Sequence, residues 1–149
     1  MTTCDGLWLR TARLIPAPRA AVWQAMTNPD ELAEWWGPKG FTVPSVDFEP
    51  RVGRNFRITM QPPGGDVFHL LGQFREVNFP SRLCYTFVWD PPDPDDRETV
   101  VTLSLQDSAE HTEVQLLQGE FTTQERLDLH DNGWRESFEK LEALLGNRR

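Results

Sequence analysis

The sequence has few residues that could support metal, redox or nucleophilic chemistry. Its two cysteines, Cys4 and Cys84, lie far apart and form no metal-binding or redox spacing. It has three histidines, but no Gly-x-Ser-x-Gly elbow and no His-Glu-x-x-His pair. Arg126 and Trp134 stand four positions from His130, so no second ligand shares its helical face. We therefore expect no bound metal and no cofactor.

Long apolar runs and an excess of positive charge are also absent. No stretch reaches the length of a membrane span, and the first residues do not combine a basic region with an apolar run. The formal net charge is -8 at pH 7. So acidic a protein is repelled by nucleic acids and by anionic membrane surfaces. We expect a cytoplasmic protein with reduced thiols and with neither nucleic acid nor a membrane as partner.

Aromatic residues, in contrast, are abundant. The 149 residues include six Trp and nine Phe, enough for a core rich in rings. A chain of this length corresponds to one domain, residues 1–149, and shows no internal repeat and no linker. The sequence leaves the oligomeric state open, and a homodimer is one alternative.

The last long segment, residues 123–145, predicts one amphipathic helix. Thr122 or Thr123 can cap its start, and Gly146 can end it. Its apolar residues recur at intervals of seven, four, three and four, as on one helical face. They are Leu127, Trp134, Phe138, Leu141 and Leu145.

Three small or polar residues lie beside this apolar face. At about 100° per residue, His130, Gly133 and Ser137 form one strip along the helix. A glycine inside a helix costs about 1 kcal/mol relative to alanine, so Gly133 requires a structural reason. It can leave room between the helix and a sheet, or it can allow the sheet backbone to approach closely. The sequence does not distinguish these two explanations.

The rest of the chain predicts a strand, two short helices and then an antiparallel meander. The strand spans residues 7–15, and the helices span 20–26 and 30–35, the second with Asn28 as cap and Pro29 at its start. Close spacing and turn residues predict hairpin connections between the strands that follow. These strands are expected at residues 41–48, 55–60, 67–77, 83–89, 99–105 and 112–118. The fold class is therefore α+β.

One connection in this meander is strongly acidic. Residues 90–96 contain four aspartates, Asp90, Asp93, Asp95 and Asp96. The tract lacks the Gly and terminal Glu spacing of a calcium loop. Its prolines indicate an exposed, extended turn.

Three motifs, in this order, resemble those of the START-like (Bet v 1-like, helix-grip) superfamily. Residues 18–29 resemble its Pro-x-x-x-Val-Trp-x-Ala-x-Thr-x-Pro pattern, residues 35–38 its Trp-Trp-Gly-Pro, and residues 130–134 its His-x-x-Gly-Trp. Within the superfamily, the chain is similar to single-domain homologues of the C-terminal domain of the Hsp90 ATPase activator. It departs from them at residues 51–54, Arg-Val-Gly-Arg, where the family usually has Arg-Pro-Gly-Gly.

The resemblance implies a helix-grip fold, in which a curved antiparallel sheet of about seven strands wraps around the long C-terminal helix. It also implies a cavity between sheet and helix, where family members bind small apolar or amphipathic ligands. A minority of members are enzymes, and relatives in the broader superfamily include polyketide cyclases and aromatases. Because sites are grafted onto one scaffold, the fold alone does not decide the function.

We therefore expect a small apolar or aromatic molecule to bind between the sheet and the last helix. His130 or Tyr85 is expected to supply an orienting hydrogen bond, and Trp35 and Trp36 are candidates for a gate at the open end. The alternative is that the aromatic residues simply form the core. The candidate ligand-binding residues are Trp35, Trp36, Phe56, Phe68, Tyr85, Phe87, Trp89, His130, Gly133, Trp134, Ser137 and Phe138.

Two other functions stay open. The first is a cyclase, aromatase or hydrolase with His130 as the catalytic base, although no orienting partner motif accompanies it. The second is a co-chaperone-like module that acts on Hsp90. We expect this role less, because the chain lacks the additional N-terminal domain of the eukaryotic activator.

Overall fold

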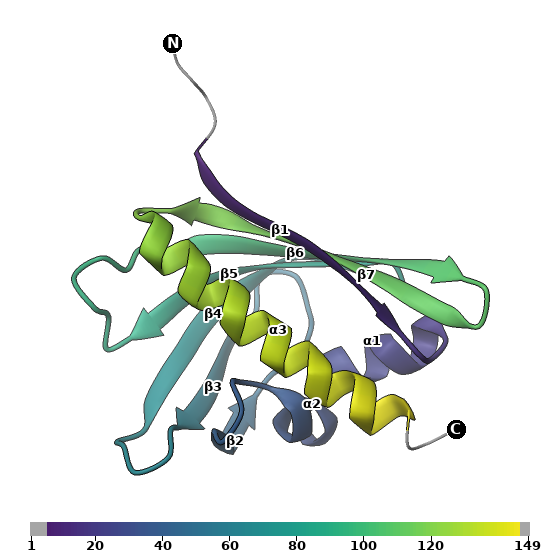
Figure 1. The fold of residues 1–149 in the computed structure, drawn as a ribbon, viewed down its shortest axis with the longest axis horizontal. Helices are drawn as coiled ribbons and strands as arrows, with labels where there is room; N and C mark the ends of the chain where they lie inside the picture. The colour runs from purple at the N-terminus through teal and green to yellow at the C-terminus, as the bar shows by residue number, and fades with distance from the viewer. Residues whose placement is uncertain (1–5, 147–149) are drawn as a thin grey trace.

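The computed structural model describes residues 6–146, so Cys4 lies outside the described residues. Its helices and strands are, in chain order, β1 (Leu7–Ile15), α1 (Arg19–Thr27), α2 (Pro29–Trp35), β2 (Thr42–Asp47), β3 (Asn55–Gln61), β4 (Phe68–Asn78), β5 (Arg82–Asp90), β6 (Thr99–Ser108), β7 (His111–Phe121) and α3 (Gln124–Gly146). The seven strands form one curved antiparallel sheet that wraps around α3 (Figure 1). The predicted α+β helix-grip fold is confirmed.

The strands follow one another in space almost as they do in sequence. The sheet order is β1-β7-β6-β5-β4-β3-β2, so β2 to β7 form a continuous meander and β1 pairs with the last strand. Helices α1 and α2 connect the two edge strands and lie beside the C-terminal half of α3 (Figure 1). The N-terminal half of α3 lies close to the β5–β6 connection, which Arg126 reaches by an ion pair with Asp93 (Figure 1).

Alternating side chains fix which face of the sheet is buried. In β5, Leu83 and Tyr85 point inward, and they pair with Leu103 and Val101 of β6. All four are at most 1% exposed. Burying an apolar side chain of this size stabilises a fold by about 1.5–3 kcal/mol, so a one-residue slip between these strands would be costly.

The helix ends agree with the predicted caps. The Asn28 side chain accepts hydrogen bonds from the backbone N–H groups of Asp30 and Glu31, at 3.0 and 3.1 Å. At the start of α3, Thr123 Oγ1 accepts a hydrogen bond from Arg126 N at 3.1 Å. Thr123 rather than Thr122 is therefore the cap of α3.

The turn that departs from the family pattern still closes its hairpin. Arg54 N donates to Arg51 O at 2.9 Å, and Gly53 adopts a φ of 88°. Only glycine adopts such a φ without strain, which explains why Gly53 stands there although the preceding proline is replaced by Val52. Of the helices between residues 6 and 146, none offers the length of apolar sequence that a membrane crossing requires.

Candidate functional site

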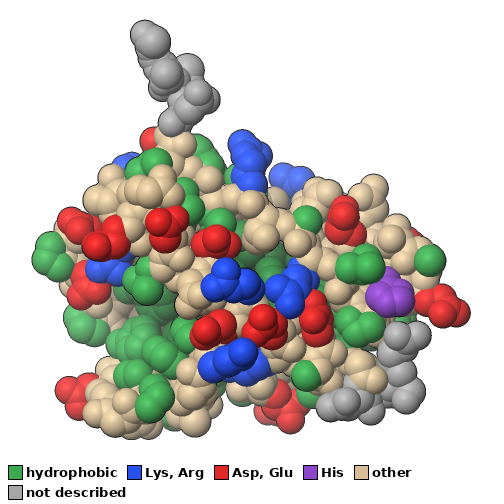
Figure 2. Space-filling view, in the orientation of Figure 1, with side chains coloured by type: hydrophobic (Ala, Val, Ile, Leu, Met, Phe, Trp, Pro, Cys, Tyr) green, Lys and Arg blue, Asp and Glu red, His purple; other side chains and the backbone are tan. Residues whose placement is uncertain are grey.

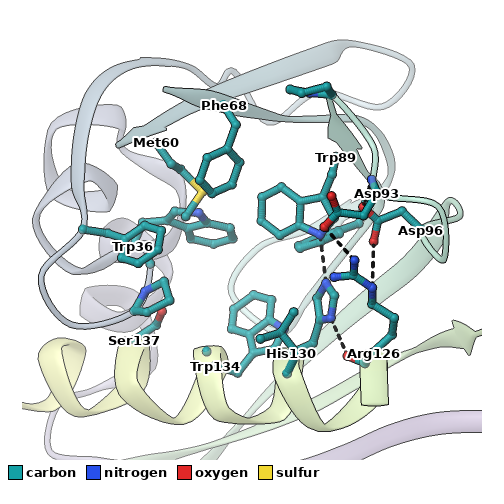
Figure 3. A pocket seen from close by; sticks show the side chains of 17 residues that line it. Trp36, Met60, Phe68, Trp89, Asp93, Asp96, Arg126, His130, Trp134 and Ser137 are labelled. Carbon is teal, nitrogen blue, oxygen red and sulfur yellow. Dashed lines mark hydrogen bonds and ion pairs between the residues drawn. The ribbon is translucent and has the colours of Figure 1, made fainter. Parts of the chain in front are cut away.

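A pocket of about 380 Å³ opens between α3, the inner face of the sheet and two loops. Hydrophobic side chains gather in this recess at the left of the molecule in Figure 2. Its lining is mostly apolar and aromatic, with a few polar residues at the two ends (Figure 3). The lining residues are Trp36, Gly37, Pro38, Phe41, Met60, Phe68, Phe87, Trp89, Pro91, Asp93, Asp96, Arg126, Leu129, His130, Gly133, Trp134 and Ser137.

The aromatic side chains of the pocket hold one another in place. Trp36 meets Trp134 edge to face, with ring centroids 5.2 Å apart and an interplanar angle of 81°. On the sheet, Trp89 contacts both Phe68 and Phe87, with ring centroids 5.3 and 5.1 Å apart. Such contacts are favourable beyond the area they bury, so the pocket has fixed, flat walls before any ligand enters.

The strip predicted on α3 faces the pocket. His130, Gly133 and Ser137 all line it, as their helical spacing indicates. A Cβ atom on Gly133 would meet only Pro38 Cγ, at 3.8 Å, which is an ordinary contact distance. No sheet backbone approaches this glycine, so close packing does not explain it. Its missing side chain instead leaves room inside the pocket.

Both ring nitrogens of His130 are engaged. Nδ1 lies 2.7 Å from Arg126 O, and Nε2 lies 2.9 Å from the indole Nε1 of Trp89. Because the carbonyl can only accept and the indole can only donate, Nδ1 carries the proton and Nε2 accepts. Burial lowers the pKa of His130, which favours this neutral form. The imidazole therefore has no free nitrogen with which to take a proton from a ligand.

Trp134 is held from behind by a buried polar side chain. Gln118 is 0% exposed, and its Oε1 accepts a hydrogen bond from Trp134 Nε1 at 2.8 Å. The amide nitrogen of Gln118 donates in turn to Thr99 Oγ1 at 3.0 Å. This chain of bonds between β6, β7 and α3 orients the tryptophan ring that forms the floor of the pocket.

The acidic connection between β5 and β6 closes one end of the pocket through Arg126. The guanidinium bonds Asp93 at 2.6 Å and lies 3.5 Å from Asp96, whose side chain is only 6% exposed (Figure 3). The hydrogen bond to Asp93 raises the pKa of Arg126. The sequence predicted that this turn is exposed. That prediction holds for the Asp93 side chain, at 67% exposure, but is wrong for the Asp96 side chain. Within residues 6–146, no three His, Cys, Asp or Glu side chains are grouped as a metal site would require.

The opposite end is closed by the segment that follows α2. Lys140 Nζ donates to the backbone oxygens of Trp36 and Pro38, each at 3.4 Å. The backbone N–H of Lys39 donates to Glu136 at 3.0 Å. Partial burial of Lys140 lowers its pKa. These contacts fix Trp36 and Pro38 against α3.

Four of the twelve candidate residues do not line the pocket but lie in the core. They are Trp35, Phe56, Tyr85 and Phe138. Tyr85 packs edge to face against Phe56, and burial raises the pKa of its hydroxyl far above the ordinary value. Because it lies outside the pocket, Tyr85 cannot supply the orienting hydrogen bond expected of it.

The two adjacent tryptophans divide between core and pocket. Trp35 is the last residue of α2, is 1% exposed and donates from Nε1 to Ala25 O at 2.8 Å. Trp36 follows with extended backbone, at φ -68° and ψ 138°, and so turns its ring toward α3. Trp35 is therefore a core residue and cannot act as the expected gate. Trp36 forms a wall of the pocket.

The pocket also contains residues that the sequence did not indicate. Strand alternation could have suggested Met60, which is buried on β3. No local signal identifies the loop residues, because Arg126 meets Asp93 across 33 positions of the chain. The lining residues missed are Gly37, Pro38, Phe41, Met60, Pro91, Asp93, Asp96, Arg126 and Leu129.

A curved sheet wrapped around a terminal helix, with an aromatic pocket beside that helix, defines a START-like helix-grip domain. Sequence comparison identifies the family. The family model described as "Activator of Hsp90 ATPase homolog 1-like protein" matches residues 16–146, so the chain belongs to this family. No curated protein matches the chain.

Several solved structures share the fold. The AHSA1 protein from Silicibacter pomeroyi is 27% identical, with a TM-score of 0.83 over 95% of this chain and 99% of that one. A protein from Mesorhizobium loti is 29% identical, with a TM-score of 0.79 over 95% and 98% of the two chains. A Chromobacterium violaceum protein, 24% identical, reaches a TM-score of 0.84 over 93% and 96%.

Proposed function

We propose that this protein binds a small, flat, apolar molecule in the pocket between the sheet and α3. The observation that carries the proposal is Gly133, a helix-interior glycine that no packing contact requires and that opens onto aromatic walls. The volume of about 380 Å³ falls within the range of small-molecule sites, roughly 300–1,000 Å³. Three tryptophans and three phenylalanines supply flat surfaces against which an aromatic ligand can stack.

The state of His130 argues against an enzyme that uses it as a base. Its accepting nitrogen is occupied by the Trp89 indole, and burial lowers its pKa. A general base needs that nitrogen within reach of the proton it abstracts. A co-chaperone role rests on the family description alone.

Native mass spectrometry of freshly purified protein tests the proposal. We expect an additional mass that is retained under gentle conditions and lost on denaturation. The Gly133→Leu variant, whose side chain would enter the pocket, should not carry this mass. Asn132→Leu is the matched control, since Asn132 lies on the exposed side of α3, and it should retain the mass. The same added mass on Gly133→Leu would overturn the proposal, as would a bare protein that also fails to bind fused-ring aromatic probes.

A further inference from the structure

The Ser137 hydroxyl is buried but has no hydrogen-bond partner among the described residues. It is 4% exposed, lies on α3 and lines the pocket. Among residues 6–146, no group forms a hydrogen bond with its hydroxyl, not even the Gly133 carbonyl one turn earlier, to which a helical serine can bond. Buried hydroxyls are nearly always paired, so an unpaired one at a pocket wall requires an explanation.

The remaining polar groups deeper in the pocket are already satisfied. His130 uses both ring nitrogens, and the indole N–H of Trp134 is bound to Gln118. The guanidinium of Arg126 is held by Asp93 and Asp96. Arg126 still has N–H groups on Nη1, but they belong to a cation already paired with two carboxylates. Ser137 is therefore the uncharged α3 side chain in the pocket that can still offer a hydrogen bond.

A second unpaired donor lies at the same end of the pocket. The indole N–H of Trp36, which is 5% exposed, has no hydrogen-bond partner among the described residues. Ser137 lies on α3 at the side of the pocket where Trp36 lies (Figure 3). The Ser137 hydroxyl can donate and accept, so its end of the pocket suits an oxygen atom of a ligand.

The two ends of the pocket differ in charge as well as in polarity. At 1.5 Å per residue, the eleven positions from Arg126 to Ser137 place them roughly 16 Å apart along α3. At the Arg126 end, two carboxylates face one guanidinium, an excess of negative charge that disfavours an anion. At the Ser137 end the lining groups are uncharged. The nearby cation, Lys140, does not line the pocket and donates to the backbone oxygens of Trp36 and Pro38, so an ionised ligand group buried there would lack a direct counter-charge.

We propose that Ser137 is the hydrogen-bonding anchor of this pocket and that it selects the ligand class. The ligand is an uncharged, flat, apolar molecule with one hydroxyl or carbonyl oxygen, and that oxygen lies against Ser137. The aromatic remainder extends along Gly133 toward His130, between the rings of Trp134 and Trp89. This inference rests on the proposed binding function. It specifies, in addition, how the ligand is oriented in the pocket and how polar the ligand is.

The test compares three probes of the same ring system: 2-naphthol, 2-methylnaphthalene and 2-naphthoate. Quenching of the pocket tryptophans reports the binding of each. One hydrogen bond to a neutral group corresponds to about fivefold in affinity. The wild-type protein should therefore bind 2-naphthol about fivefold more tightly than 2-methylnaphthalene, and 2-naphthoate most weakly.

The variant Ser137→Ala removes one oxygen and hardly changes the volume. It should lose the preference for 2-naphthol, so that the affinity ratio falls to about one, whereas the exposed-side control Asn132→Ala should keep it. Ser137→Ala should also unfold at the same temperature as the wild type or higher, because it removes an unpaired buried hydroxyl.

Three outcomes overturn the inference: equal binding of 2-naphthol and 2-methylnaphthalene by the wild type, an unchanged preference in Ser137→Ala, or a clear loss of thermal stability in that variant. The last would reveal that Ser137 has a structural partner. Failure of the binding function is a different result, in which none of the three probes quenches the pocket tryptophans of any variant.

Discussion

The indole N–H of Trp89 donates a hydrogen bond to Nε2 of His130 across 2.9 Å, and this contact joins strand β5 to helix α3 at the pocket. The bond requires a neutral imidazole, because a protonated Nε2 would present a second N–H to the indole. His130 also packs against the ring of Phe121, with centroids 4.8 Å apart. His130 is therefore a fixed, uncharged part of the pocket wall.

The first prediction concerns the pH dependence of stability. Burial lowers the folded-state pKa of His130 below the ordinary value of 6.5, so near and below that pH the unfolded chain binds more protons than the folded protein. The contribution of His130 is complete above its unfolded pKa and is lost as the pH falls toward its folded pKa. The free energy of unfolding of the wild type should therefore decrease between pH 7.5 and pH 5.

His130→Phe removes the titrating group, and denaturant titrations at several pH values compare it with the wild type. The difference in unfolding free energy between the two proteins should change with pH across this window. A difference that stays constant from pH 7.5 to pH 5 would show that His130 does not gain a proton on unfolding.

The second prediction concerns Gly133 and separates stability from binding. Gly133→Ala should raise the free energy of unfolding by about 1 kcal/mol, because alanine favours the helix and its Cβ meets only Pro38 Cγ at 3.8 Å. Gly133→Leu should fill part of the pocket and weaken the binding of 2-naphthol. Urea unfolding and tryptophan quenching measure the two effects. A Gly133→Ala protein less stable than the wild type would mean that the glycine is needed for packing.

The third prediction concerns the ion pairs that hold the β5–β6 connection. Arg126→Gln should cost about 1 kcal/mol of stability, since Asp93 is largely exposed and exposed pairs contribute little. Its larger effect should be local: residues 91–98 should exchange amide hydrogens faster, because Asp93 and Asp96 lose their shared partner.

Arg97→Gln, an exposed position of the same connection, is the matched control and should leave the exchange rates unchanged. Hydrogen exchange read by mass spectrometry resolves this segment. Identical protection of residues 91–98 in Arg126→Gln and the wild type would show that the ion pairs do not hold the connection.

The fourth prediction concerns the buried amide of Gln118. Gln118→Leu should destabilise the protein by about 1–3 kcal/mol, because it leaves the buried Trp134 indole N–H without its acceptor and removes the donor to Thr99 Oγ1, which keeps only its bond to Phe87 O. In the background of Trp134→Phe, which has no indole N–H, the same change should cost less. A double-mutant cycle by chemical denaturation measures this coupling. Additive effects of the two substitutions would contradict the hydrogen bond between them.

Much of the fold could be predicted from local patterns. The apolar spacing of α3 and the cap at Asn28 each depend on residues within a few positions of one another. Strand limits were less accurate: β7 runs to Phe121, three residues beyond the predicted end. In that extension Gly119 pairs with Val100 of β6 and Phe121 with Leu7 at the start of β1, and pairing with so distant a strand as β1 leaves no local signal.

The sequence by itself determined that His130, Gly133 and Ser137 share one side of α3, because helical geometry fixes that relation wherever the helix packs. Only the tertiary structure decided which aromatic rings meet that strip. Trp36 reaches it while Trp35 does not, because the backbone leaves the helix between them. The closure by Arg126 and the bond from Trp89 to His130 likewise join segments more than thirty positions apart. Such contacts depend on how the sheet curves and how it packs on α3. Local sequence patterns do not predict either of these.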